Sequence, residues 1–552
     1  MATSKRPNIL LILADDMGYS DIGCYGGEID TPNLDRLAAN GLRYTQFYNT
    51  ARCCPTRASL LTGMHPHQVG MGHMAHFDDD LDGYRGDLSK NCVTIGEVLK
   101  GSGYGAYLSG KWHVCQQLIE EQGDKSNWPR SRGFDRFYGI TGGAASYFDL
   151  PTLTEDDDNI ETPRDEDFYF TDAVSQKACS FIEDHLEQRP DQPFFLYAAY
   201  TAPHWPLHAK PETIAKYQGR FSQGWDVLRE ERLRRLIELG ILDENTQLTR
   251  RDSTQPAWEE APNKEWQERR MEVYAAQIDS MDQGIGRIVE TLESSGELDN
   301  TLILFLADNG ACAEEIFDTF FPYEKPAGKG RAKPLSCGAY TRDGREMKHG
   351  NDPEIMPGDE TTFQSYGVAW ANLSNTPFRE YKHFVHEGGI ATPLIAHWPR
   401  GIEGKGGLRR ETGQLTDIMA TIVDVCQADW PEAREGSPIL PCEGESLRPS
   451  FVGSEELVRP PLAWEHEGNC AYREGRWKLV KRWDRSNWEL YDLEIDRSEL
   501  NDLANEQKEL AAEMMNKYQS WADRVGVVEW GELEAARNAR GIHTDWMPHP
   551  HD

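Results

Sequence analysis

Two apolar runs of strand length in this sequence each end in a pair of side chains that carry hard oxygen ligands. The pairs are Asp15 with Asp16 and Asp308 with Asn309. Because ligands of an open α/β sheet gather beyond the carboxyl ends of its strands, we expect these side chains to meet at one edge. Two like charges about 4 Å apart cost on the order of 4 kcal/mol at an effective dielectric of roughly 20, so the cluster calls for a cation. An all-oxygen set favours Ca²⁺ or Mg²⁺ over zinc, whereas either pair alone could be a helix cap or a loop acid.

A second feature is the passage CCPTRASLLTG, which runs from Cys53 to Gly63. Proline followed by small residues predicts the start of a helix, whose free N–H groups and dipole favour an anion and lower the pKa of a nearby thiol. Cys53 or Cys54 is therefore a candidate nucleophile. The alternative is that both are small buried hydrophobic residues at a helix start.

The elements that must position these residues follow from the apolar runs, which are continuous rather than alternating. The runs are Ile9–Leu13, Tyr104–Leu108, Phe194–Ala199, Leu302–Leu306 and Leu394–Ala396. This pattern is typical of strands buried on both faces of a parallel sheet. Helices are predicted between them, at Asn33–Ala39, Thr94–Lys100, Asp172–Glu187, Glu272–Ser294 and Thr416–Cys426. The order predicts an α/β fold with a large, mostly parallel sheet flanked by helices.

From about Pro441 the sequence pattern changes and predicts short strands separated by turns, followed by one helix. The strands are predicted at Leu462–Trp464, Cys470–Arg473, Trp477–Arg482 and Trp488–Leu490, and the helix at Glu506–Val525. We therefore expect a catalytic α/β domain over residues 1–440 and a smaller C-terminal domain, an antiparallel sheet plus helix, over 441–552. Residues 156–166, 230–268 and 314–366 are predicted to be insertions or long excursions, and the His-rich end from His543 to Asp552 a solvated tail.

The charge balance excludes several classes of partner. Of 552 residues, 92 are Asp or Glu and 58 are Lys or Arg, which gives a formal net charge of −34. This excess argues against non-specific binding to nucleic acid or anionic lipid, and no run reaches the 18 or so apolar residues of a membrane span. The 11 Cys residues show no paired spacing, which predicts mostly reduced thiols. Pro7 interrupts the first apolar run and no leader cleavage site follows, which predicts a cytoplasmic protein, or a periplasmic or secreted one if a leader was trimmed.

The motif Cys53-x-Pro55-x-Arg57, with Leu60 and Thr62-Gly63 after it, resembles the signature of the formylglycine-dependent type I sulfatases. The order of the other motifs along nearly the whole chain is also similar to that of bacterial arylsulfatases in this family, which belongs to the alkaline phosphatase superfamily. The resemblance implies a large α/β domain with a smaller C-terminal sheet domain. It also implies that Cys53, not Cys54, is oxidised to formylglycine by a formylglycine-generating enzyme.

The resemblance further implies a mechanism and a metal. Hydrated formylglycine is a geminal diol: one hydroxyl attacks sulfur and forms a covalent sulfo-enzyme, and the second then loses its proton so that sulfate is expelled. One Ca²⁺ per chain is implied, with ligands from both strand ends and from the modified cysteine. These ligands would be Asp15, Asp16, Asp308, Asn309 and the residue made from Cys53.

The family's cationic and imidazole groups each match a position near a strand end. By resemblance, Lys111 and Lys382 would bind the sulfate oxygens, and His113 would orient the diol or remove its proton. His204 would protonate the leaving oxygen, and Arg57 would offset the acid cluster. Taken singly, these would be surface lysines or core histidines, so their joint order carries the prediction.

The predicted activity is hydrolysis of small anionic sulfate esters, with aryl sulfates as substrates in vitro and the natural ester open. The nearest rival is a phosphonate monoester or phosphodiester hydrolase of the same superfamily. Such enzymes tend to carry His where this chain has Asn309 and to lack both sulfate-binding lysines, so Asn309, Lys111 and Lys382 favour a sulfatase. A non-catalytic protein that binds sulfated ligands is a more distant alternative. The sequence leaves the oligomeric state open.

Overall fold

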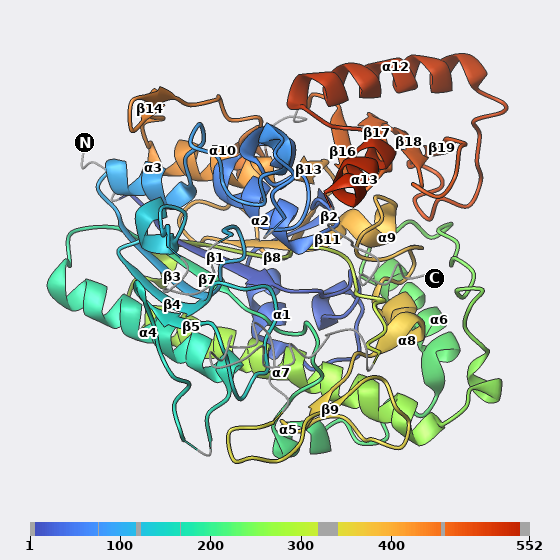
Figure 1. Cartoon of the computed structure of the whole chain (residues 1–552), viewed down its shortest axis with the longest axis horizontal. Coiled ribbons are helices and arrows are strands. Elements are labelled where there is room, and N and C mark those ends of the chain that lie inside the picture. The colour runs from blue at the N-terminus through green and yellow to red at the C-terminus, as the bar shows by residue number, and fades with distance from the viewer. Residues whose placement is uncertain are drawn as a thin grey trace.

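A large mixed sheet with helices on both faces forms the body of the molecule, and a small antiparallel sheet packs against it (Figure 1). The computed structural model describes residues 6–75, 77–116, 123–165, 167–317, 340–453 and 459–540. The predicted fold class, a mostly parallel sheet flanked by helices with a C-terminal antiparallel sheet and helix, is confirmed. No helix in these ranges is long and apolar enough to cross a membrane.

The middle of the large sheet consists of parallel strands in the order β8-β1-β7-β3-β4. Their bounds are Thr301–Ala307, Asn8–Ala14, Phe194–Ala199, Gly105–Lys111 and Arg136–Ile140. On one side β11 (Ala391–His397) pairs antiparallel with β8 and with β2 (Leu42–Tyr48), which carries β12 (Gly407–Arg409) and β13 (Gly413–Gln414). On the other side β5 (Leu153–Glu155) and β6 (Asp158–Asn159) continue from β4. The run predicted at residues 394–396 is thus a strand that runs against its neighbours.

Helices cover both faces of the large sheet, because the central strands carry apolar side chains on both faces. In β1, Leu10 and Ile12 belong to one hydrophobic core, and Ile9, Leu11 and Leu13 belong to the other. The helices α1 (Pro32–Ala39), α4 (Phe170–Gln188) and α7 (Lys264–Ser294) cover the first face. The helices α2 (Cys53–Thr62), α3 (Ile95–Gly101) and α10 (Thr416–Cys426) cover the second, and the two groups lie on opposite sides of the sheet in Figure 1.

Shorter elements fill the long connections. The helices are α5 (Pro211–Ala215), α6 (Gly224–Glu238), α8 (Gly367–Ser374), α9 (Glu387–Ile390) and α11 (Arg448–Phe451). The two-residue strands are β9 (Lys348–His349), β10 (Thr362–Phe363), β14 (Ala433–Arg434) and β15 (Ser437–Pro438). The charged stretch at 230–268 therefore begins inside a helix, α6, and ends in another, α7.

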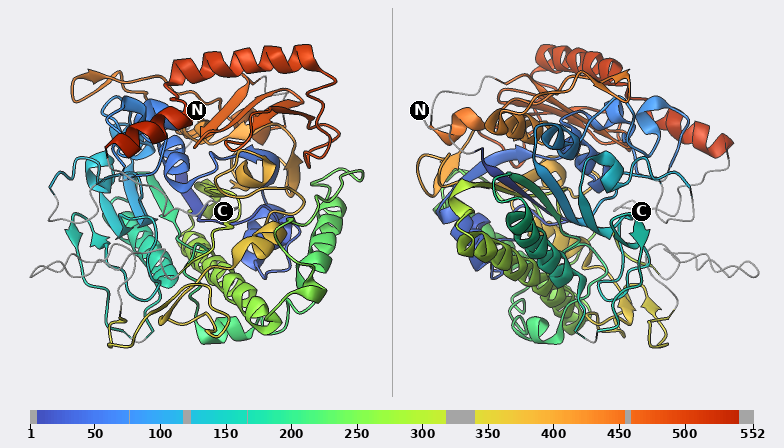
Figure 2. Two further views of the ribbon diagram at one scale, coloured as in Figure 1. Left: turned by 45° about the vertical axis from the view of Figure 1, so that its right-hand side comes forward. Right: turned by 90° about the vertical axis from the view of Figure 1, so that its left-hand side faces the viewer.

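The small sheet is an antiparallel meander of four strands, β16 to β19. Their bounds are Leu462–His466, Asn469–Glu474, Trp477–Lys481 and Glu489–Asp492. Helix α12 (Lys508–Val525) covers one face of this sheet, as Figure 2 shows, while Trp464, Val480 and Tyr491 from the other face join a core of the large domain. Helix α13 (Trp530–Ala539) follows, and the predicted tail from His543 to Asp552 lies outside the described residues.

Candidate active site

The strand register brings the two predicted ligand pairs together. Ala14 of β1 pairs with Ala307 of β8, so Asp15 and Asp308 leave the sheet side by side. The backbone N–H of Asp16 donates to Asp308 Oδ1 at 3.2 Å, and Asn309 Nδ2 donates to Asp16 Oδ1 at 2.7 Å. All four side chains are buried. The edge predicted to hold a cation therefore carries three carboxylates and one amide within a single hydrogen-bonded cluster.

Two oxygens of this cluster are available as ligands for a cation. Among the described residues, neither Asp15 Oδ1 nor Asn309 Oδ1 accepts a hydrogen bond, although both are buried. Burial and the neighbouring Asp308 raise the pKa of Asp15 well above its ordinary value, because a second negative charge here is costly. The donor set consists of hard oxygens, which suits Ca²⁺ or Mg²⁺.

Each carboxylate of the cluster is paired with a buried cationic side chain. The pairs are Lys111 Nζ with Asp15 Oδ2 at 2.6 Å, Arg57 Nη2 with Asp308 Oδ2 at 2.8 Å, and Lys382 Nζ with Asp16 Oδ2 at 3.0 Å. Arg57 also lies 3.5 Å from Asp15 Oδ2 and donates to the carbonyl of Lys111 at 3.1 Å. Three negative and three positive side chains thus balance, so a divalent cation would leave the site with two positive charges.

Lys111 reaches the site because β3 lies very close to β7 at its end. Gly110 has φ of 121°, and a Cβ there would lie 1.9 Å from the carbonyl oxygen of Ala199. Only glycine permits both the conformation and the approach. The strand therefore delivers Lys111 to the carboxylate edge, and His113 follows two residues later with φ of 55°.

Cys53 is the first residue of α2, as the sequence predicted for a helix start, and it is 2% exposed. A hydrogen bond from Cys54, followed by the charges of Lys111 and His113, lowers the pKa of Cys53 well below its ordinary value, against the effect of burial. Burial raises the pKa of Cys54, whose Sγ lies 3.2 Å from His113 Nε2. Of the two candidate thiols, Cys53 is the one held toward the thiolate form.

His204 stands on the other side of Asp16. Its Nε2 lies 3.3 Å from Asp16 Oδ2 and 3.4 Å from Lys382 Nζ. Its Nδ1 donates to the carbonyl of Trp205 at 2.7 Å, which leaves Nε2 as the atom that can accept or release a proton. Burial lowers the pKa of His204 to about 4. The structure thus brings together the predicted Lys382, His204 and acid cluster.

Comparison with known proteins decides the family. A family model described as Sulfatase matches residues 7–428, and one described as N-sulphoglucosamine sulphohydrolase, C-terminal, matches residues 379–523. The chain belongs to the sulfatase family. It is 32% identical to an uncharacterised sulfatase of Schizosaccharomyces pombe, with 96% of this chain and 95% of the relative covered. It is 33% identical to an arylsulfatase of Klebsiella aerogenes, with 81% of this chain and 92% of the relative covered.

The fold agrees with solved sulfatase structures. The crystal structure of Ps i-CgsB superposes on this sulfatase with a TM-score of 0.66 and 23% identity over 98% of both chains. The matching family model and the arylsulfatase relative confirm the family expected from the sequence, the type I sulfatases of the alkaline phosphatase superfamily. This chain is an enzyme that hydrolyses sulfate esters.

Glu314 is a site residue of this sulfatase that the sequence did not indicate. Its Oε1 accepts from Arg52 Nη1 at 2.8 Å, and its Oε2 accepts from Trp205 Nε1 at 2.9 Å and lies 3.6 Å from Lys382 Nζ. Lys382 and Arg52 outweigh the effect of burial and lower the pKa of Glu314. The only available signal was its place six residues beyond Asp308, at the start of a predicted excursion. Glu314 therefore links Arg52 to Lys382 and to the indole of Trp205, both of which lie beside His204.

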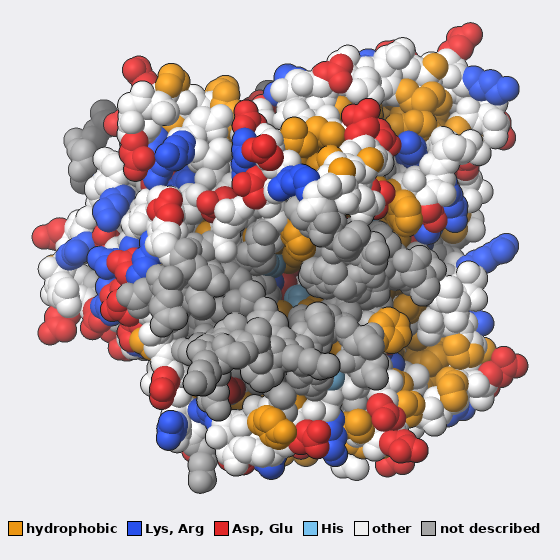
Figure 3. All heavy atoms as spheres, in the orientation of Figure 1, with side chains coloured by type: hydrophobic (Ala, Val, Ile, Leu, Met, Phe, Trp, Pro, Cys, Tyr) orange, Lys and Arg blue, Asp and Glu red, His pale blue; other side chains and the backbone are white. Residues whose placement is uncertain are grey.

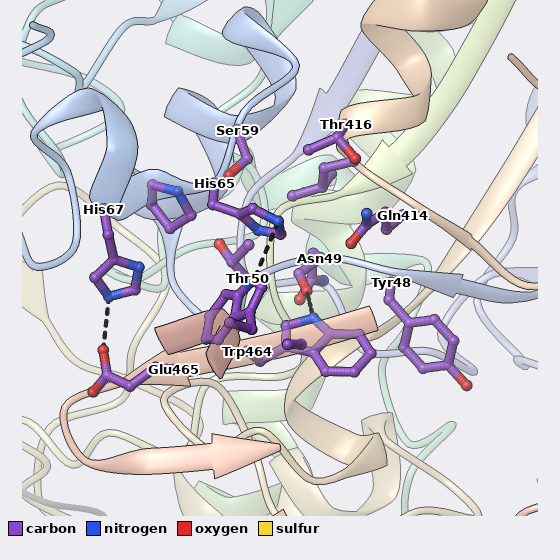
Figure 4. A pocket seen from close by; sticks show the side chains of 14 residues that line it. Tyr48, Asn49, Thr50, Ser59, His65, His67, Gln414, Thr416, Trp464 and Glu465 are labelled. Atoms are coloured by element: carbon purple, nitrogen blue, oxygen red, sulfur yellow. Dashed lines mark hydrogen bonds and ion pairs between the residues drawn. The ribbon is translucent and has the colours of Figure 1, made fainter. Parts of the chain in front are cut away.

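The molecule has a hollow in its surface and a separate small cavity in its interior. In Figure 3, histidine side chains are visible in a hollow near the middle of this face, with acidic and basic side chains scattered over its described surface. A separate cavity of about 20 Å³ lies between α2 and the C-terminal sheet, where Ser59, His65, Thr416 and Trp464 line it (Figure 4). It is large enough for about one water molecule and does not include the carboxylate cluster.

Proposed function

We propose that this sulfatase cleaves aryl sulfate monoesters at a Ca²⁺ site, with a formylglycine made from Cys53 as the source of its nucleophile. The buried cluster of carboxylates carries the proposal, because two of its oxygens lack a partner among the described residues and its cations face the same edge. The thiol of Cys53 lies beside this cluster, since Lys111 both pairs with Asp15 and lowers the pKa of Cys53.

The cation would be held by residues from both strand ends and from α2. They are Asp15, Asp16, Asp308, Asn309 and the residue made from Cys53. Bound there, Ca²⁺ would supply positive charge to a sulfate oxygen and to the nucleophile. Because the chain's own charges balance in this cluster, that charge is what gives an acidic protein a local attraction for an anionic ester.

Each side chain around the cluster is proposed to have one role in sulfate transfer. Oxidation of Cys53, by a formylglycine-generating enzyme, would supply a geminal diol oxygen as the nucleophile toward sulfur. Lys111, which pairs with Asp15, and Lys382, which pairs with Asp16, would bind the sulfate oxygens. His113 lies beside the two cysteines at the start of α2, where it can accept a proton from the nucleophile.

His204 is proposed as the acid for the leaving oxygen. Its Nδ1–H is fixed by the carbonyl of Trp205, so Nε2 would have to carry the proton for the leaving oxygen, against the burial that lowers the pKa of His204 to about 4. Asp16, 3.3 Å away, stabilises the imidazolium form. Trp205 packs on His204 with ring centroids 4.3 Å apart and is partly exposed, which supports an aryl leaving group on this side of the site. The arylsulfatase relative of Klebsiella aerogenes points to the same substrate class.

The test is hydrolysis of 4-nitrophenyl sulfate, with a matching aryl phosphonate monoester in parallel. The enzyme is Ca²⁺-loaded protein produced together with a formylglycine-generating enzyme, and the control is its Cys53→Ala variant. Sulfate turnover that exceeds phosphonate turnover and disappears in the variant supports the proposal. A preference for the phosphonate would assign the chain to the rival branch of the superfamily, and turnover that persists in Cys53→Ala would refute the nucleophile.

A further inference from the structure

A second cluster of ligating side chains lies between the two domains. It consists of His73, His383, His466 and Glu467, each at most 5% exposed, and is called here the interdomain histidine cluster. His383 follows Lys382 in the loop before α9, whereas His466 and Glu467 lie at the turn from β16 to β17. The mechanism above uses none of these four side chains.

Glu467 is the centre of the cluster. Its Oε2 lies 2.8 Å from His383 Nδ1, and its Oε1 lies 2.7 Å from His73 Nε2 and 3.5 Å from His466 Nε2. In the described part of the chain, its ion-pair partners are these imidazoles, with no Lys or Arg among them. The charge of Arg52 also acts on Glu467, but Arg52 is paired with Glu314 at 2.8 Å. A buried carboxylate whose direct partners are imidazoles therefore calls for a further positive charge.

His73 donates a hydrogen bond to the carboxylate of Glu467. Arg537 Nη2 donates to His73 Nδ1 at 2.8 Å, so the hydrogen of the neutral ring is on Nε2, which donates to Glu467. Arg537 is itself paired with Asp79 at 2.6 Å. His73 is therefore an orienting residue and not a free ligand.

His466 provides the observation that points to a ligand. Its side chain is fully buried, yet neither ring nitrogen has a hydrogen-bond partner within the described ranges. Buried polar groups in proteins are almost always paired, and each unpaired one costs about 1–3 kcal/mol. Because His466 Nε2 faces the same carboxylate as His383 Nδ1, an ion between the three residues would give His466 Nε2 a partner.

We infer that His383, His466 and Glu467 form a second metal site, which takes Zn²⁺. Their ligand atoms all lie within 4.8 Å of one another. A tetrahedral ion with metal–ligand distances of about 2.0–2.1 Å sets its ligand atoms roughly 3.3 Å apart. The separations of 2.8 Å and 3.5 Å lie on either side of this value, but they join the two imidazoles to different oxygens of Glu467, so the carboxylate must turn slightly to share an ion with both rings. Two imidazoles select zinc over Ca²⁺, and a fourth position is left for water.

The zinc would tie the C-terminal hairpin to the loop that carries Lys382. This loop is already held by His383 N–H, which donates to the carbonyl of Ala51 at 2.7 Å, and by Asn469 Nδ2, which donates to the carbonyl of His383 at 3.3 Å. An ion shared by residues 383, 466 and 467 adds a bond between the domains next to a sulfate-binding lysine. The site stands on its own geometry and does not depend on the proposed nucleophile.

The experiment measures zinc per chain by mass spectrometry in full-length protein that has been saturated with Ca²⁺ and exposed to Zn²⁺. We expect about one zinc per chain in the wild type and at least tenfold less in His466→Ala and in the near-isosteric Glu467→Gln. His67→Ala is the matched control, because His67 is also a buried imidazole on a carboxylate, 2.7 Å from Glu465, but outside the cluster. It should keep its zinc. Circular dichroism checks that each variant is folded.

Cys53, Cys54 and His113 form another candidate set for a soft metal, so the wild type is compared with Cys53→Ala. Zinc that remains in Cys53→Ala and is lost in Glu467→Gln supports the inference. In Co²⁺-substituted protein we expect visible bands without thiolate charge transfer, and an affinity about 10- to 100-fold weaker in His73→Ala. Absence of zinc from folded wild type would overturn the inference. Zinc that follows Cys53 alone would also overturn the site.

Discussion

Glu314→Gln is the sharpest test of how the site is held together. The change removes one negative charge but keeps the shape and an oxygen that can still accept from Trp205. Arg52 Nη1 lies 2.8 Å and Lys382 Nζ 3.6 Å from the two carboxylate oxygens, and all three side chains are at least nine-tenths buried. The variant therefore leaves a buried arginine without its closest counter-charge.

The magnitude follows from these distances. At an effective dielectric of roughly 20, the pairs with Arg52 and Lys382 are worth about 6 and about 5 kcal/mol of direct attraction. Desolvation cancels part of this, and loss of one partner from a buried pair costs about 3–5 kcal/mol. We expect the lower end, about 3 kcal/mol of unfolding free energy, because the amide still accepts from Trp205. We also expect kcat/KM for an aryl sulfate to fall about tenfold, since Lys382 loses an anchor.

Urea unfolding followed by tryptophan fluorescence measures the first quantity, and steady-state kinetics measures the second. Glu354→Gln is the control, because Glu354 is an exposed carboxylate on the same excursion. It should change the unfolding free energy by less than about 0.5 kcal/mol. If Glu314→Gln lost less than about 1 kcal/mol and kept its kcat/KM, the role assigned to Glu314 would be wrong.

Three further perturbations test other parts of the account. Removal of Ca²⁺ with EGTA should abolish sulfate hydrolysis. It should also lower the melting temperature by about 3 °C from the value measured with Ca²⁺ at 100 times its Kd. The Asp16→Asn variant should show neither response to EGTA. Lys382→Met should lower kcat/KM about 10²- to 10³-fold in steady-state assays with Ca²⁺ content unchanged; an unchanged rate would remove Lys382 from sulfate binding. Lys478 and Arg497 outweigh the effect of burial and lower the pKa of Glu387 from 4.5 to about 2. The contribution of Glu387 to the stability of the fold is therefore complete above about pH 4.5 and is lost as the pH falls toward 2. Between pH 5 and pH 3, Glu387→Gln should therefore lose about 2 kcal/mol less unfolding free energy than the wild type, and equal losses would contradict the shift.

The sequence predicted the centre of the fold because those strands are buried on both faces. Four of the five continuous apolar runs fall within β1, β7, β8 and β11, and the fifth, Tyr104–Leu108, begins one residue before β3. It did not indicate β2, in which Arg43 and Gln46 alternate with buried residues and break the run. The insertion expected at 230–268 in fact begins inside α6. The sequence did not indicate this, because a charged residue such as Arg232 reads as solvated. In the structure it is buried against Asp21 and Glu28, at 2.8 and 2.6 Å.

The site was predictable where it depends on strand ends and not where it depends on long-range contacts. Asp15 and Asp308 end neighbouring strands, so their meeting follows from the register. Glu314 and His466 have no such marker, since Glu314 contacts Arg52 across 262 positions and His466 lies on the separate C-terminal sheet. Charges that pair across the fold leave no spacing pattern in the chain.

The most direct test of the central claim relates turnover to the chemical state of one residue. Samples are made with different amounts of formylglycine-generating enzyme, and peptide mass spectrometry gives the fraction of Cys53 that is converted in each. If formylglycine made from Cys53 supplies the nucleophile, kcat for 4-nitrophenyl sulfate, per chain at saturating Ca²⁺, should rise in proportion to that fraction and extrapolate to zero when all of Cys53 is thiol. Substantial turnover at zero conversion, or turnover independent of conversion, would contradict it.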